Sequence, residues 1–118
     1  MKNFDRITEI YDLLNQGKGL EAFDKYYGDE VVMIEATGDK REGKPANRAY
    51  EENFFGSIKE FHDAGVVSIA NDEQRGITMV ESWMDVTFKD GNRVKLEQIA
   101  RQNWEDGKIT EERFYFNA

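Results

Sequence analysis

The sequence predicts a single α+β domain in which helices precede most of an antiparallel sheet. Apolar residues recur at helical spacing through most of the first 61 residues and alternate with polar residues after position 66. Two Asp-Gly dipeptides, at positions 90–91 and 106–107, supply the positive φ angles that tight hairpin turns require. The chain has 118 residues and no linker or repeat, so we expect one domain over residues 1–118.

The same helical and alternating spacings of apolar residues predict the individual helices and strands. The predicted helices cover residues 4–16, 19–27 and 45–61, and the predicted strands cover 31–36, 66–70, 77–88, 93–104 and 109–116. Asn3 suits the N-cap of the first helix and Gly17 its end. Pro45 suits the first turn of the third helix. A polar connector, residues 37–43, joins the first strand to that helix.

Composition excludes several kinds of site and partner. The chain has no cysteine and one histidine, His62, which rules out disulfides, thiolate zinc sites and multi-histidine metal sites. A net charge of −8 argues against nucleic-acid binding, which needs a clustered basic face. No apolar run is long enough for a signal peptide core or a membrane span. We therefore expect a soluble cytoplasmic protein without a metal, in which His62 is a helix-terminal charge rather than a catalytic group.

A two-residue turn at positions 90–91 would set the register of the central hairpin. Trp83 then faces Gln98, and Asp85, Glu81, Gln102 and Trp104 share their side of the sheet. Both faces of this hairpin mix large apolar groups with charges, unlike a sheet with one solvated side. The Trp83 face is the predicted ligand cleft, and the opposite face is expected to be partly buried against a second subunit.

The face that the last strand presents depends on its turn. A two-residue turn at positions 106–107 places on the Trp104 side Ile109, Glu111, Arg113 and Tyr115. A three-residue turn with Gly107 in the left-handed region places there Thr110, Glu112, Phe114 and Phe116. The residues alone leave both arrangements open.

Three segments carry a family resemblance: FDKYYGDEVVMIEATG (23–38), REGKPANRAYEENFF (41–55) and QIARQNWEDGKITEERFYF (98–116). The first is similar to the helix-to-strand passage, and the last to the final hairpin, of the nuclear-transport-factor-2-like superfamily in its SnoaL-like (polyketide-cyclase-like) branch. The resemblance covers nearly the whole chain. It implies a cone-shaped, cystatin-like roll with three N-terminal helices packed on a curved, mostly antiparallel sheet. It also implies a pocket between helices and sheet, and a homodimer through the outer sheet face.

The superfamily includes ketosteroid isomerase, and that comparison implies roles for particular residues. Glu35, at the end of the first strand, matches the general base of that enzyme. The positions that match its two oxyanion donors fall near Ile10 and Ala100, which carry no donor group. The resemblance also favours the three-residue second turn, with Glu112 and Phe114 inside the pocket.

Two functions follow from these features. The first is an enzyme that transfers protons on a small molecule without a cofactor, of isomerase, cyclase, dehydratase or hydrolase type. Glu35 would be its base, and Asp85 or Glu112 its acid or water-orienting group. The expected ligand-binding residues are Tyr50, Glu81, Trp83, Gln98, Gln102, Trp104 and Phe114. The second function is a non-catalytic dimeric module for ligand binding or protein interaction, whose carboxylates are only solvated.

Overall fold

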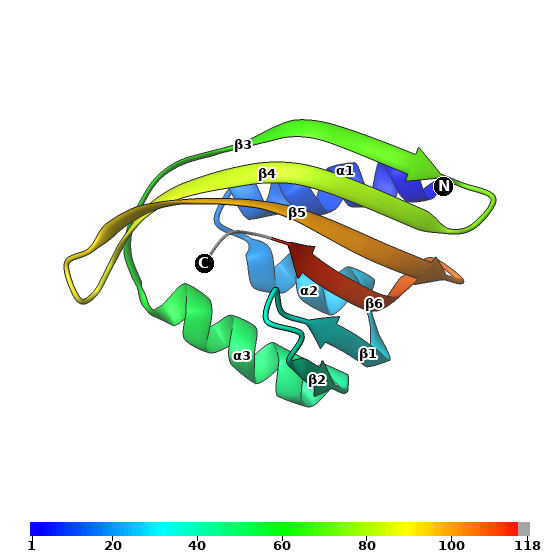
Figure 1. Ribbon diagram of the computed structural model, residues 1–118, viewed down its shortest axis with the longest axis horizontal. Coiled ribbons are helices and arrows are strands. Elements are labelled where there is room, and N and C mark those ends of the chain that lie inside the picture. The colour runs from blue at the N-terminus through cyan, green and yellow to red at the C-terminus, as the bar shows by residue number, and fades with distance from the viewer. Residues whose placement is uncertain (116–118) are drawn as a thin grey trace.

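The computed structural model describes residues 1–115 and shows three helices packed on one side of a single curled sheet (Figure 1). The helices are α1 (Asn3–Asn15), α2 (Gly19–Tyr26) and α3 (Lys44–Gly56), and none is long and apolar enough to cross a membrane. The strands are β1 (Tyr27–Ile34), β2 (Lys40–Glu42), β3 (Ile58–Asp72), β4 (Ile77–Phe88), β5 (Arg93–Glu105) and β6 (Lys108–Tyr115). Their order is β2-β1-β6-β5-β4-β3, and only β1 and β6 pair in parallel. The predicted α+β class is confirmed.

The third helix ends earlier than its apolar spacing predicts. α3 stops at Gly56, and residues 58–72 form one long strand instead of a helix to Phe61 and a short strand at 66–70. β3 pairs with β4 over its whole length, and this tertiary pairing overrides the local helical pattern. Three register shifts in that pairing accompany the bend of β3 over the helices in Figure 1. The expected connector at residues 37–43 contains the short strand β2.

Two smaller differences occur at the N-terminal ends of elements. Asn3 is the first residue of α1 rather than its cap, because Lys2 occupies the cap position. The backbone N–H of Lys2 donates to the Asp5 side chain at 3.3 Å, which satisfies one donor at this helix end. The first strand begins at Tyr27, directly after α2, and not at residue 31.

The predicted two-residue turn at positions 90–91 is wrong. Phe88 and Asn92 pair through the Phe88 N–H, so the turn contains three residues, with Gly91 at φ 94°. The register of β4 with β5 therefore shifts by one residue, and Trp83 faces Glu97 instead of Gln98. Side chains alternate between the two faces along a strand. The β5 residues that were predicted to share a face with Trp83 therefore lie on the opposite face of the sheet.

The second hairpin combines parts of both predicted arrangements. Asp106 and Gly107 form a two-residue turn with φ angles of 51° and 77°, and Trp104 faces Ile109. The next pair is Asn103 with Glu111, which leaves one extra residue, Thr110, in a bulge. After the bulge, Glu112 faces Gln102 and Phe114 faces Ala100 on the inner side. Thr110 is exposed, and Phe116 lies outside the described residues.

The hydrophobic core lies between the helices and the concave face of the sheet. Its buried members include Ile7, Ile10, Tyr11, Ala22, Phe23, Tyr26, Tyr27, Val31, Met33, Val80, Trp104 and Ile109. Polar residues share this interior: Thr78 and Gln102 are fully buried, and Glu112 is 3% exposed. Burial of polar groups is costly unless each has a hydrogen-bond partner, so their partners define the candidate site.

Candidate functional site

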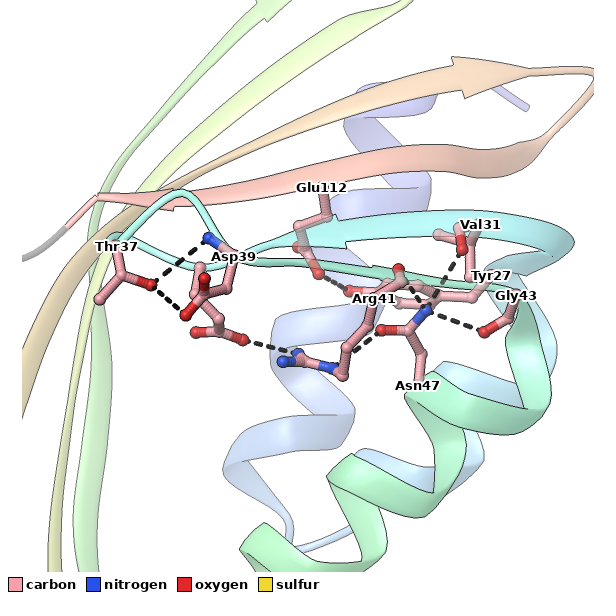
Figure 2. A network of polar contacts seen from close by, with 9 residues as sticks. Tyr27, Val31, Thr37, Asp39, Arg41, Gly43, Asn47 and Glu112 are labelled. Atoms are coloured by element: carbon pink, nitrogen blue, oxygen red, sulfur yellow. Dashed lines mark hydrogen bonds and ion pairs between the residues drawn. The ribbon is translucent and has the colours of Figure 1, made fainter.

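Glu112 of β6 stands at the centre of a buried group of polar side chains. Its Oε1 accepts a hydrogen bond from the Tyr27 hydroxyl of β1 at 2.5 Å, which Figure 2 shows. Its Oε2 accepts one from Nε2 of Gln102 on β5 at 2.7 Å. The parallel pairing of β1 with β6 and the bulge at Thr110 together bring these three side chains to the same inner face.

Two further residues extend this group along the sheet. The Thr78 hydroxyl of β4 donates to Oε1 of Gln102 at 2.7 Å. The indole N–H of Trp104 donates in turn to the Thr78 hydroxyl at 2.9 Å. Thr78, Gln102 and Trp104 therefore form, with Glu112 and Tyr27, one continuous line of hydrogen bonds, which we call the inner relay.

Burial makes Glu112 a weak acid. Removal from water raises its pKa from 4.5 to about 7, and the negative charge of Glu35 adds to this. The hydrogen bonds from Tyr27 and Gln102 favour the charged form and act in the opposite direction. Burial likewise raises the pKa of Tyr27 well above its usual range, with the Glu112 charge as the next cause. Near neutral pH, Glu112 is thus divided between its acid and carboxylate forms.

A second weak acid, Glu51, comes from α3. Burial raises its pKa from 4.5 to about 7; the Glu112 charge also raises it, and Arg41 lowers it. Tyr11 of α1 faces the same interior, where burial and the Glu112 charge raise its pKa and the Ser82 hydroxyl lowers it. Two carboxyl groups from different elements therefore influence each other's protonation within the cone.

Glu35 lies beside this interior and is held by an arginine. Its Oε1 accepts from Nη2 of Arg41 at 2.6 Å, and both side chains are about one-fifth exposed. Arg41 also donates from Nε to Asn47 at 3.2 Å, and its guanidinium stacks 3.5 Å from the centre of the Tyr50 ring. Asn47 is fully buried and donates to the carbonyl oxygens of Val31, Arg41 and Gly43 (Figure 2). These bonds hold the Arg41 side chain next to Glu35.

An apolar hollow lies where the C-terminal ends of α1 and α3 meet the start of α2 and of β3. It has a volume of about 410 Å³ and is lined by Leu14, Gly17, Lys18, Gly19, Leu20, Glu21, Phe55, Ile58, Lys59, Phe61 and Met84. Leu14 is one helical turn past Tyr11 on α1, and Phe55 is one turn past Glu51 on α3. Met84 points to the same side of β4 as Ser82, two residues away. Three elements, α1, α3 and β4, thus contribute residues to both the hollow and the polar interior.

The predicted site residues fall into two groups on opposite faces of the sheet. Gln98, Gln102, Trp104, Glu112 and Phe114 lie on the concave side, and Glu35 and Tyr50 meet at Arg41. The one-residue register shift puts Glu81, Trp83 and Asp85 on the convex side, so their predicted place in the cleft is wrong. Asp85 forms an ion pair there with Arg93 at 2.9 Å.

Several residues of the interior are missing from the sequence-based prediction. They are Tyr11, Tyr27, Arg41, Asn47, Glu51 and Thr78. Positions 47, 51 and 55 are one helical turn apart, so the burial of Asn47 in the structure implies an inward Glu51, whereas the sequence alone does not show which face of this helix is buried. Within residues 1–115, no three His, Asp or Glu side chains come close enough together to hold a metal ion.

The sequence signature of the SnoaL-like domain matches residues 2–116. The chain belongs to the SnoaL-like family. Among solved structures, a proposed SnoaL-like polyketide cyclase from Mesorhizobium loti is 28% identical, with a TM-score of 0.84 over 98% of this chain and 100% of that one. No curated protein sequence matches the chain.

Two less similar structures share the fold. A proposed polyketide cyclase from Pseudomonas putida is 16% identical, with a TM-score of 0.84 over 99% of this chain and 92% of that one. An epoxide hydrolase from Mycobacterium tuberculosis is 18% identical, with a TM-score of 0.76 over 96% and 80%. The SnoaL-like fold is therefore shared by proteins named for different reactions, and the side chains of this chain have to decide between them.

Proposed function

We propose that the chain is a small-molecule enzyme that transfers protons without a cofactor, of isomerase, cyclase, dehydratase or hydrolase type. One observation carries the proposal: burial raises the pKa of both the partly buried Glu51 of α3 and the buried Glu112 of β6 to about 7, and the charge of Glu112 acts on Glu51. The apolar part of the ligand would occupy the hollow that α2 and β3 line together with the ends of α1 and α3 and with Met84 of β4. Its reacting end faces Glu51 and Glu112.

The two weak acids suit general acid–base catalysis. A carboxyl group with a pKa near the working pH exists in both forms, so one group of the pair removes a proton while the other supplies one. Because the charge of Glu112 raises the pKa of Glu51, the first ionisation makes the second harder. At neutral pH this favours the state in which the two groups hold one proton between them.

Glu35 is the third carboxyl group of the proposed mechanism. It retains the base role that its position at the end of β1 implies, and Arg41 supplies a fixed positive charge beside it. An arginine stacked on Tyr50 and bonded to the buried Asn47 needs little rearrangement to stabilise a negative charge that develops on a ligand. Glu35 and Arg41 would thus act on the side of the interior where β1 meets α3.

Turnover of simple probes tests the proposal. Proton transfer is followed by NMR in deuterated water with a β,γ-unsaturated cyclohexenone, and hydrolysis with styrene oxide. Glu51→Gln and Glu112→Gln should each lower kcat by roughly a hundredfold or more, with a bell-shaped pH profile in the wild type. Glu97→Gln, on the convex face, is the matched control and should change nothing. Equal turnover in all four proteins would remove both acids from the mechanism.

A second candidate, a non-catalytic dimeric binding module, is favoured by a different observation. Both carboxylate oxygens of Glu112 already have partners within the chain. The convex face also exposes Met79, Ile99 and Tyr115 by 44%, 44% and 47%, as a surface that a second copy would cover. Ile99→Asp should then convert a dimer of 13.7 kDa chains to a monomer in light scattering. A wild type that is already monomeric at micromolar concentration contradicts the dimer.

A further inference from the structure

The inner relay has a direction, which its first donor sets. The indole nitrogen of Trp104 can only donate a hydrogen bond, and the Thr78 hydroxyl receives it at 2.9 Å. The single hydrogen of Thr78 is then free to be donated to Gln102 Oε1 at 2.7 Å. The amide of Gln102 is held with its NH2 group towards Glu112, because its oxygen is engaged by Thr78.

This orientation decides where a proton resides on Glu112. Its Oε2 already accepts an N–H from Gln102 at 2.7 Å, so a proton there would meet another hydrogen. The Oε1 atom faces the Tyr27 oxygen at 2.5 Å, and a hydroxyl oxygen can accept. A neutral Glu112 therefore carries its proton on Oε1 and donates it to Tyr27.

The protonation state of Glu112 in turn determines which way the hydroxyl hydrogen of Tyr27 points. Only one hydrogen fits between two oxygens 2.5 Å apart. When Glu112 is ionised, Tyr27 supplies that hydrogen. When Glu112 is neutral, it supplies the hydrogen itself, and the hydroxyl hydrogen of Tyr27 has to point elsewhere. The other groups whose charges act on Tyr27 are Glu51 of α3 and Tyr11 of α1.

We propose that Trp104, Thr78 and Gln102 are positioning residues that place the proton of Glu112 on Oε1, so that the neutral acid turns Tyr27 into a donor towards a ligand oxygen. The inference rests on the proposed function for its ligand. It identifies the substrate end as an acceptor, such as a ketone or epoxide oxygen. Ile10 and Ala100, near the positions that match the oxyanion donors of ketosteroid isomerase, carry no donor group. Tyr27 of β1 then supplies the missing hydrogen-bond donor.

NMR titration of the protein without any ligand tests the relay. In the wild type, the indole N–H resonance of Trp104 should titrate with the same midpoint as the Glu112 carboxyl carbon, three hydrogen bonds away. The only other tryptophan is Trp83, so a Trp83→Phe protein assigns the signal. Glu35 acts on Glu112 through its charge, and Glu51 and Tyr11 face the same interior. Glu51→Gln removes the neighbour whose pKa is also about 7.

Variants at Thr78 distinguish a role of its hydroxyl in the inner relay from a role of the side chain in packing alone. Thr78→Val keeps the shape but frees Gln102 to rotate, so the bond that favours the carboxylate weakens and the Glu112 midpoint should rise by roughly one pH unit. Thr78→Ser restores the hydroxyl and should restore both the midpoint and its coupling to Trp104. Thr110→Val, at the exposed bulge, is the control. Trp104→Phe tests the same step if Thr78→Val does not fold.

A Trp104 resonance that does not titrate in the wild type overturns the relay. So does a Glu112 midpoint that is the same in Thr78→Val, or in Trp104→Phe, as in the wild type. Because no ligand is present, these outcomes are independent of turnover. A working relay with no activity on any probe would contradict the proposed function alone, whereas activity without coupling would contradict the relay alone.

Discussion

Replacing Glu112 by glutamine should make the protein more stable at high pH. The glutamine has the shape of the neutral acid: its oxygen can accept from Gln102, and its NH2 group can donate to Tyr27, as the protonated carboxyl does. It carries no charge that burial would penalise. Glu112→Gln therefore removes the cost of a buried carboxylate while keeping both hydrogen bonds.

The magnitude follows from the pKa of Glu112. Burial raises the pKa from 4.5 to about 7, so between these values the folded protein holds a proton that the unfolded chain has lost. This contribution to the free energy of unfolding is fully present below 4.5 and is lost as pH rises through about 7. At 1.36 kcal/mol per pH unit, the loss is about 3 kcal/mol.

Urea unfolding at about pH 5 and about pH 8 measures this difference. Glu112→Gln should match the wild type within about 1 kcal/mol at the lower pH and exceed it by up to about 3 kcal/mol at the higher pH. Glu97→Gln, on the convex face, should keep the pH dependence of the wild type. If Glu112→Gln and the wild type lose stability in parallel, Glu112 is ionised in the folded protein and the reasoning fails.

Three further predictions concern neighbouring features. Asn47→Ala removes three hydrogen bonds to backbone carbonyl groups and the Asn47 acceptor of Arg41 Nε, so it should lower the free energy of unfolding by roughly 2–4 kcal/mol, measured by urea; a loss below about 1 kcal/mol contradicts this. Arg41→Met removes the charge that lowers the pKa of Glu51, so the Glu51 midpoint in NMR should rise. Gly65→Ala puts a methyl group 2.7 Å from the Trp83 indole, which should displace the ring and change its fluorescence; an unchanged spectrum contradicts this.

The order of elements could be predicted from the sequence, but hairpin register could not. The two Asp-Gly dipeptides look alike, yet one forms a three-residue and the other a two-residue turn. At the first turn, the N–H of Lys89 donates to the Ser57 carbonyl oxygen, a partner distant in sequence, and does not pair with Asn92. Because this contact exists only in the folded chain, local turn chemistry cannot specify the loop length.

Only part of the candidate site could be predicted from the sequence, because the rest depends on strand register and on the rotation of a helix. Glu35 and Glu112 were within reach through the family resemblance, and Gln102 through strand alternation, which places it on the side of Trp104. Asp85 was misplaced because a one-residue error in register exchanges the two faces of the sheet. Glu51 depends on how α3 rotates against the sheet, and only the bonds of buried Asn47 establish that rotation.

The single extra residue at Thr110 has an evolutionary consequence. Because Thr110 and Glu111 together lie opposite Asn103, deleting Thr110 would give a regular hairpin and leave Glu112 facing Gln102 on the inner side. Losing the bulge while keeping every residue would instead turn Glu111 and Arg113 inward and Glu112 outward, and the interior would exchange its weak acid for an arginine. Related chains with this last hairpin one residue shorter are therefore expected to keep an inward acid, whereas chains of equal length without the bulge are not.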